Sequence, residues 1–243
     1  MAVYSIPLSL FEGCRATLNG KPGPMLMLGP PGSGKGTQSS EVASRWRVPR
    51  ISTGDLLRFN VSRWTHLGRF ADGFMKSGRL VPDELISDMV AERLANADTL
   101  RGFVLDGFPR TVRQAIWLDE LLGKQSEVLP PIMISFRVDL DRLISRVVGR
   151  KICPVCGSTY HDVFCPPQLT GTCNRDGAPL EQRADDTLEV MHKRLKVYQA
   201  QTKPIIERYQ SSRYFSPIDG DRPISEVTET IVRTIRHVRG LQV

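Results

Sequence analysis

The sequence lacks several features that would place it in a special class of protein. No apolar run in its 243 residues approaches the roughly 20 residues that a membrane-spanning helix needs. We find no internal repeat and no low-complexity tract, which argues against repeat arrays and disordered tails. Aromatic residues are only 7% of the chain and do not alternate with basic residues in the pattern that stacks nucleic-acid bases. We therefore expect one globular α/β protein with inserted subdomains.

Acidic residues are also scarce relative to basic ones, 26 against 33, which leaves a net charge of +7. This positive charge has three interpretations: a solvated basic surface, a nucleic-acid partner, or an arginine-lined cleft for polyphosphates. Several arginines fall inside motifs rather than in charge runs, which favours the cleft.

Residues 1–24 lack the charged start, long apolar middle and small-residue cleavage site of a secretory signal. Glu12 is their one acidic residue, so a weak organelle-targeting segment is the alternative to a simple N-terminal arm. We expect an arm, a cytoplasmic location and no membrane partner.

A glycine-rich run, Gly29–Thr37 (GPPGSGKGT), follows the apolar stretch Met25–Leu28 and precedes a helical pattern. Glycines let the backbone N–H groups turn toward an anion, and the start of the next helix adds partial positive charge. Lys35 adds a full charge that can reach terminal phosphates. We predict a nucleoside triphosphate site rather than a turn that binds nothing. The general motif has Ser or Thr directly after the Lys, whereas here Gly36 comes first and Thr37 second.

Strand and helix patterns alternate along the chain. The strand-like runs are Met25–Leu28, a short one around Ile51, Phe103–Leu105, Ile132–Val138 and Tyr214–Ile218. The helical patterns cover Gly34–Trp46, Asp83–Leu94, Val112–Leu122, Leu140–Val148, Thr187–Tyr209 and Ser225–Val238. The alternation predicts a parallel sheet with helices on both faces and ligands at the carboxyl ends of its strands, where Asp106 also falls.

Four of the five cysteines lie in a Cys-, Pro- and Gly-rich insert, residues 150–183. Cys153 and Cys156 form one short turn, and Cys173 with Asp176 forms another, which is the ligand spacing of a zinc ribbon. A disulfide pair or free thiols are the alternatives, and Cys165 and His161 are spare ligand candidates. Four protein ligands would make the metal structural, since no position is left open for a substrate.

Arginines recur beside Gly, Asp and hydroxyl residues, as in Ser52–Arg58, Asp106–Gln114 and Arg183–Asp186. Arg146 and Arg150 are four residues apart, and we expect them on one helix face. The interior of the long helix pattern contains Pro204, which we expect to kink or end it.

From residue 25 to the end, the chain closely resembles adenylate kinases of the long-lid type. The resemblance rests on GPPGSGKGT, ISTGDLLR (51–58), GRLVPDELI (78–86), GFVLDGFPRT (102–111), VVGRKICPVCGSTYH (147–161) and QRADD (182–186), in the family's order. The GKGT form of the glycine loop is also the family's. The chain departs from the family's pattern at two positions: Arg113 stands where members of the family often have Pro, and Arg222 stands where Lys is common.

The resemblance implies a P-loop core at 25–51, 82–149 and 188–243 behind an N-terminal arm at 1–24. It also implies an AMP-binding helical subdomain at 52–81 and a zinc-ribbon-like lid at 150–187. The implied reaction is phosphoryl transfer from ATP to AMP, giving two ADP, by a monomer that needs Mg²⁺ and one structural Zn²⁺ and binds no nucleic acid. Another nucleoside monophosphate kinase, with GTP as donor or UMP or CMP as acceptor, is the alternative. A zinc-ribbon nucleic-acid-binding protein is the alternative from another class.

The resemblance also implies roles for individual residues. The ATP-binding set is Gly32, Ser33, Gly34, Lys35, Gly36, Thr37, Arg146, Arg150, Tyr160 and Arg222. The AMP-binding set is Thr53, Arg58, Arg79, Val81, Gly107, Arg110, Gln114, Arg183 and Arg194. The catalytic cations are Lys35, Arg110, Arg146, Arg150, Arg183 and Arg194. Asp106 would hold Mg²⁺ through water, and the zinc ligands would be Cys153, Cys156, Cys173 and Asp176.

Overall fold

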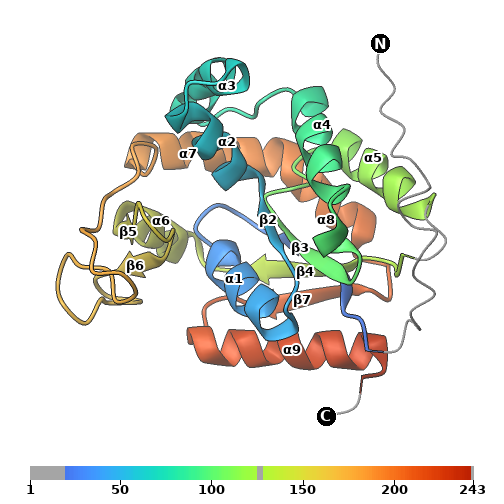
Figure 1. Ribbon diagram of the computed structural model, residues 1–243. Helices are drawn as coiled ribbons and strands as arrows, with labels where there is room; N and C mark the ends of the chain where they lie inside the picture. The colour runs from blue at the N-terminus through green and yellow to red at the C-terminus, as the bar shows by residue number, and fades with distance from the viewer. Residues whose placement is uncertain (1–19, 125–127, 242–243) are drawn as a thin grey trace.

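A five-stranded parallel sheet forms the centre of the computed structural model, which describes residues 20–124 and 128–241 (Figure 1). The strand order is β2-β3-β1-β4-β7, and all neighbouring pairs are parallel. The strands are β1 (Gly23–Leu28), β2 (Arg50–Ser52), β3 (Gly102–Asp106), β4 (Ile132–Arg137) and β7 (Phe215–Asp219). Most of the expected N-terminal arm lies outside the described residues.

Helices connect these strands. They are α1 (Lys35–Trp46), α2 (Thr53–Ser62), α3 (His66–Ser77), α4 (Asp83–Leu94), α5 (Val112–Gly123), α6 (Leu140–Val148), α7 (Leu188–Val197), α8 (Lys203–Tyr209) and α9 (Ile224–Arg239). A 3-10 turn, η2 (Ala97–Thr99), precedes β3. Among the described residues, no helix is both long and apolar enough to cross a bilayer.

The sheet is buried on both faces, and successive residues of β1 point to opposite sides. Leu26 and Leu28 pack in one core cluster with residues of α4, α5 and α8. Met25 and Met27 pack in the other, with α1 and α9. This two-sided burial fixes the strand register, so the carboxyl ends of β1, β2 and β3 open at one edge of the sheet (Figure 1).

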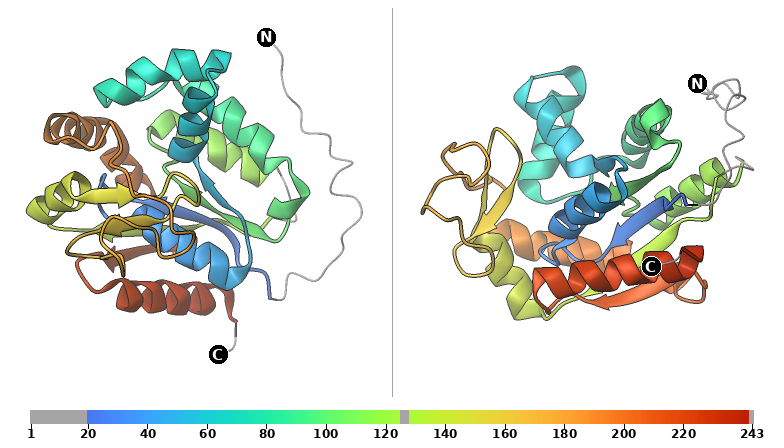
Figure 2. Two further views of the ribbon diagram at one scale, coloured as in Figure 1. Left: turned by 60° about the vertical axis from the view of Figure 1, so that its left-hand side comes forward. Right: turned by 60° about the horizontal axis from the view of Figure 1, so that its bottom comes forward.

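Two insertions project from the core as separate lobes (Figure 2). One is the α2–α3 hairpin. Its helices approach closely at Gly68, which has no side chain: a Cβ there would lie 2.0 Å from the carbonyl oxygen of Asn60. The other is the small β5 (Arg150–Ile152) and β6 (Thr159–His161) hairpin with the loops that follow it. Its core is small and centres on Cys153, Tyr160 and Cys173.

One expectation is wrong. Arg150 does not share a helix face with Arg146, because α6 ends at Val148 and Arg150 begins β5. Pro204 was expected to kink or end the long helix, and the second alternative does not hold: a π-helical segment, η3 (Tyr198–Thr202), joins α7 to α8, and Pro204 lies in the first turn of α8. Proline is tolerated there because the first N–H groups of a helix need no partner in the preceding turn. The kink stays a prediction.

The packing of α9 against the sheet gives a stability prediction. Ile231 is fully buried between α9 and the sheet, so Ile231→Ala should lower the free energy of unfolding by about 2–4 kcal/mol. Ile116→Ala is the matched control, because Ile116 is 41% exposed on α5 and should change stability by less than about 1 kcal/mol. Urea denaturation measures both; equal effects would contradict this account of the core.

Candidate active site

The glycine loop lies between the end of β1 and the start of α1. Gly32 and Gly34 have φ values of 82° and 89°, in the left-handed region that glycine adopts without strain. A Cβ at Gly32 would also lie 2.6 Å from the carbonyl oxygen of Leu143. Gly34 is the N-cap of α1 and makes no side-chain cap, so the N–H groups of the first turn are left for an anion.

Lys35 is the first residue of α1, and its ammonium folds back over the loop. Its Nζ donates to the carbonyl oxygens of Gly29 (2.8 Å) and Pro30 (2.6 Å) and to Oγ of Ser33 (3.3 Å). Burial lowers the pKa of Lys35 to about 8, against the opposing effect of nearby Asp106. The ammonium is thus held above the loop by neutral oxygens.

Asp106 ends β3 beside this loop and is 8% exposed. Its Oδ2 accepts from Nη2 of Arg50 (2.7 Å) and from Oγ of Ser39 (3.3 Å). A carboxylate oxygen at the carboxyl end of a buried strand is the kind of ligand that Mg²⁺ and its bound water take. The donor chemistry at Asp106 therefore fits a magnesium ion carried by the nucleotide.

On the other side of Asp106, the carbonyl of Gly107 organises a second group of residues. It accepts from Oγ1 of Thr53 and from Nε of Arg110, each at 2.8 Å. Gly107 has φ 81°, and a Cβ there would lie 2.9 Å from Nη2 of Arg110. One glycine carbonyl thus fixes a hydroxyl and a guanidinium side by side.

Gln114 is buried behind Arg110, and both ends of its amide are occupied. Nε2 donates to Oδ1 of Asp83 (2.8 Å), and Oε1 accepts from the backbone N–H of Arg110 (2.7 Å). A base edge would therefore have to share or displace one of these partners to be read by Gln114.

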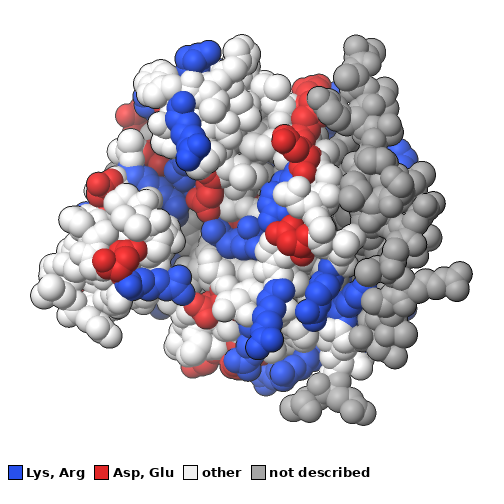
Figure 3. Space-filling model, in the orientation of Figure 1, with Lys and Arg blue, Asp and Glu red and all other residues white. Residues whose placement is uncertain are grey.

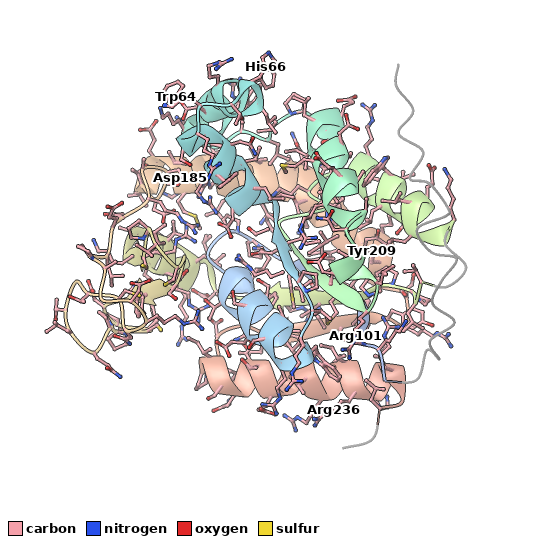
Figure 4. All side chains as sticks on the ribbon, in the orientation of Figure 1. Trp64, His66, Arg101, Asp185, Tyr209 and Arg236 are labelled. Atoms are coloured by element: carbon pink, nitrogen blue, oxygen red, sulfur yellow. The ribbon has the colours of Figure 1, made fainter. Side chains whose placement is uncertain are left out.

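Carboxylates hold the remaining arginines in place. Arg58 donates to Asp55 (2.5 Å), Nε of Arg150 donates to Asp186 (2.7 Å), and Arg194 pairs with Asp185. The labelled Asp185 lies beside α7 and near α2 (Figure 4). Figure 3 shows basic and acidic side chains close together around the hollow in the middle of this face.

Arg183 is the least satisfied of these cations. Its Nη2 lies 3.7 Å from Asp55, and its buried Nε makes no hydrogen bond to any described residue. Burial and the neighbouring Arg58 and Arg150 lower its pKa to about 10. The pKa of Asp55 is also lowered: burial opposes the shift, but Arg58 and Arg50 hold it well below its usual range.

Four of the expected nucleotide residues lie at the margins. Nη2 of Arg146 donates to the carbonyl of Gly220 (3.0 Å), Arg222 is exposed and pairs with Asp219, and Arg79 stacks over Phe74. Tyr160 points into the small core around the cysteines, where its hydroxyl lies 3.4 Å from Sγ of Cys173. A contact with a donor base would have to come from its backbone. Val81, buried in the core, likewise has only its backbone to offer.

The expected metal ligands come together in the insertion that contains β5 and β6. Ligand atoms of Cys153, Cys156, Cys173 and Asp176 all lie within 4.8 Å of one another. Tetrahedral zinc with bonds of about 2.3 Å to sulfur would separate its sulfur ligands by about 3.8 Å, so the cluster fits the ion. Sγ of Cys156 and Sγ of Cys173 are 3.5 Å apart, whereas a disulfide needs about 2.05 Å. Cys165 is outside the cluster, and His161 bonds the carbonyl of Ser145.

Sequence reasoning missed the carboxylates that pair with these arginines, and it missed Arg50 entirely. Asp55, Asp185 and Asp186 were visible only as parts of the motifs that contain them. The one signal available was their position, within a few residues of an arginine assigned to phosphate.

The fold and the site together define a P-loop phosphotransferase of the nucleoside monophosphate kinase class. A glycine loop opens at the carboxyl edge of a parallel sheet, and further arginines come from α2, from the loop after β3, from α7 and from the insertion that contains β5 and β6. A single nucleotide would not need cations on both sides of the edge.

Comparison with known proteins identifies the particular family. The sequence model for the family described as Adenylate kinase matches residues 27–214. An adenylate kinase of Desulfitobacterium hafniense is 45% identical over 212 residues, covering 87% of this chain and 97% of that protein. Those of Caldanaerobacter subterraneus and Clostridium perfringens are each 43% identical over 211 residues, covering 87% of this chain and 95% and 97% of theirs. The chain belongs to the adenylate kinase family, and it transfers a phosphoryl group from ATP to AMP to give two ADP.

The lowered pKa of Lys35 gives a pH prediction for the free protein. Its ammonium is charged below a pH of about 8 and neutral above it. Affinity for an unhydrolysable ATP analogue should therefore fall by roughly tenfold as the pH rises from 8 to about 9.5, when measured by calorimetry. Lys35→Arg keeps its charge over this range and should not show the fall; a parallel decline in both proteins would refute this origin.

Proposed function

We propose that the two halves of the site divide the two nucleotides between them. The glycine loop, with Gly32, Ser33, Gly34, Lys35, Gly36 and Thr37, holds the phosphates of ATP. Thr53, Arg58, Gly107, Arg110 and Gln114 hold AMP, with backbone contacts near Arg79 and Val81. The observation that carries this division is the carbonyl of Gly107, which fixes Thr53 and Arg110 beside Asp106 at the strand edge.

The proposed mechanism needs positioning and charge neutralisation rather than a nucleophilic side chain. A phosphate oxygen of AMP attacks the γ-phosphorus of ATP in line. Arg58 and Arg110 hold the acceptor phosphate. Lys35, Arg146, Arg150, Arg183 and Arg194 offset charge on the transferring group, since guanidinium forks match phosphate oxygens.

Four of these cations would exchange one partner for another when the nucleotides bind. Arg58, Arg150 and Arg194 leave carboxylates, and Lys35 leaves backbone carbonyls, so the phosphates replace bonds that are already charge-assisted or buried. Arg183, with a buried Nε that has no partner among the described residues, loses least by turning to phosphate.

Asp106 is the residue that we propose holds magnesium, through bound water. When present, Mg²⁺ would offset the negative charge of the donor phosphates. With Gly36 after Lys35, the usual direct hydroxyl ligand is missing, and Thr37 stands one position further along.

We propose that residues 150–187 act as a lid over the donor and that residues 52–81 form the AMP subdomain, with 25–51, 82–149 and 188–243 as the core. Closure excludes water, which competes with AMP as the acceptor. Zinc held by Cys153, Cys156, Cys173 and Asp176 would cross-link the lid, whose small core cannot supply much stability alone. Bending would then fall at its edges, near Gly149 and Ala184.

Tyr160 and Arg222 would border the donor base through backbone atoms. We further propose a cytoplasmic monomer: thiolate ligands suit a reducing compartment, and residues from one chain supply both nucleotide sites. Nucleic acid and membranes are not proposed as partners.

Arg110 tests the assignment of the acceptor site. Arg110→Lys should lower kcat/KM for AMP by about 100-fold or more, because an ammonium cannot make the forked contact with phosphate. Arg113→Lys is the control, since Arg113 is exposed and pairs with Glu84 on the surface. A coupled assay of ADP formation measures both variants. If Arg110→Lys behaves like the control, Arg110 does not hold the acceptor.

Cys173 tests the metal. Elemental analysis of the purified protein should find one zinc per chain, and Cys173→Ser should lose most of it. A loss of about 2 kcal/mol would lower the melting temperature by roughly 4–8 °C. Cys165→Ser, outside the cluster, should keep both the zinc and the melting temperature. A wild-type protein free of zinc would rule out the site.

A further inference from the structure

Arg50 is a charged residue that the division of roles above leaves unused, although it touches both halves of the site. It begins β2, and its guanidinium is half-buried between α1, α2 and β3. Nη2 donates to Asp106 (2.7 Å), Nη1 donates to Asp55 (2.8 Å), and Nε donates to Oγ of Ser39 (2.9 Å). All three nitrogens of one planar group therefore have a partner, each on a different element.

The contact with Asp106 leaves one carboxylate oxygen available. Both hydrogen bonds that described residues make to Asp106 fall on Oδ2. Arg50 and Ser39 thus anchor one oxygen, leave Oδ1 without a hydrogen bond from a described residue, and place a positive charge directly against the carboxylate.

The contact with Asp55 bears on the acceptor side. Asp55 also accepts from Arg58 (2.5 Å) and lies 3.7 Å from Arg183, so three arginines share one carboxylate. Each added cation weakens the hold of Asp55 on the others. Arg50 therefore helps to keep Arg58 and Arg183 available for phosphate.

We propose that Arg50 is a positioning residue that couples the magnesium side of the site to the AMP side. It lowers the negative charge that Asp106 presents to the metal, and it competes for Asp55 so that Arg58 can turn to the acceptor phosphate. The inference rests on the proposed roles of Asp106 and Arg58. Its test distinguishes a failure of the inference from a failure of those roles.

Two substitutions separate the charge of Arg50 from its forked geometry. Arg50→Gln removes the charge. Arg50→Lys keeps the charge, but an ammonium makes a point contact and cannot reach Asp55 and Asp106 together. We expect the lysine to choose Asp106, because this carboxylate side chain is 11% exposed and that of Asp55 is 40% exposed.

Equilibrium calorimetry supplies two readouts that do not depend on turnover. The first is the magnesium effect, defined as the Kd of an unhydrolysable ATP analogue without Mg²⁺ divided by its Kd with Mg²⁺. The second is the Kd of AMP. In Arg50→Gln the magnesium effect should rise roughly five- to tenfold, because the unmasked Asp106 attracts the metal and repels the bare nucleotide. The Kd of AMP should rise by a similar factor, because Asp55 then holds Arg58 more tightly.

Arg50→Lys should leave the magnesium effect within twofold of wild type and still weaken AMP binding. A purely structural role would lower the melting temperature without moving the magnesium effect. Arg45→Gln is the matched control, since Arg45 lies on α1 in a solvent-exposed pair with Glu229 and should change neither readout.

Asp106→Asn separates this inference from the proposed function. It should bring the magnesium effect down toward one. If it does so while Arg50→Gln leaves the magnesium effect or the AMP affinity unchanged, the inference about Arg50 is overturned and the role of Asp106 stands. If Asp106→Asn leaves the magnesium effect unchanged, both are overturned.

Discussion

Repulsion between like charges is the constraint on which this site depends. Seven cations crowd the carboxyl edge of the sheet: Lys35, Arg50, Arg58, Arg110, Arg150, Arg183 and Arg194. Four carboxylates, Asp55, Asp106, Asp185 and Asp186, lie among them and pair with most. So many positive charges at such short distances could not be held in a half-buried cleft without counter-ions, because desolvation and mutual repulsion both oppose them. In the proposed mechanism these carboxylates occupy the places that phosphates take when the substrates bind, so the site would be organised before either nucleotide arrives.

The core was predictable because its determinants are local. Each strand run is short, apolar and followed by a helical period, and parallel alternation leaves few arrangements of such elements. The glycine loop was predictable for the same reason. Gly32 and Gly34 have positive φ values that few other residues adopt, so the glycines in the sequence already indicate the backbone conformation of the loop. The family's adenylate kinase activity follows from these motifs taken in order.

The pairings were not predictable, because they depend on tertiary distances. Arg50 lies 56 positions before Asp106, and Arg150 lies 36 before Asp186. An arginine or aspartate in a loop looks the same in sequence whether it is solvated or paired. Tyr160 illustrates the same limit, since a tyrosine in an exposed-looking insert proves to be 6% exposed beside the cysteines. The group formed by Cys153, Cys156, Cys173 and Asp176 was predictable, because the spacing of two short turns already determines which side chains can meet.

Gly36 connects the sequence anomaly to this charge balance. A Cβ at position 36 would lie 3.5 Å from Nη2 of Arg50 and 3.6 Å from Oδ2 of Asp106, which are ordinary contact distances. A small side chain would therefore fit, but a hydroxyl there would compete for the ion pair that orients Asp106. Glycine leaves that ion pair undisturbed. Under the proposed role of Asp106, the metal would be held weakly, through water and one carboxylate, which suits a reversible kinase because it must release its magnesium nucleotide from the same loop that binds it.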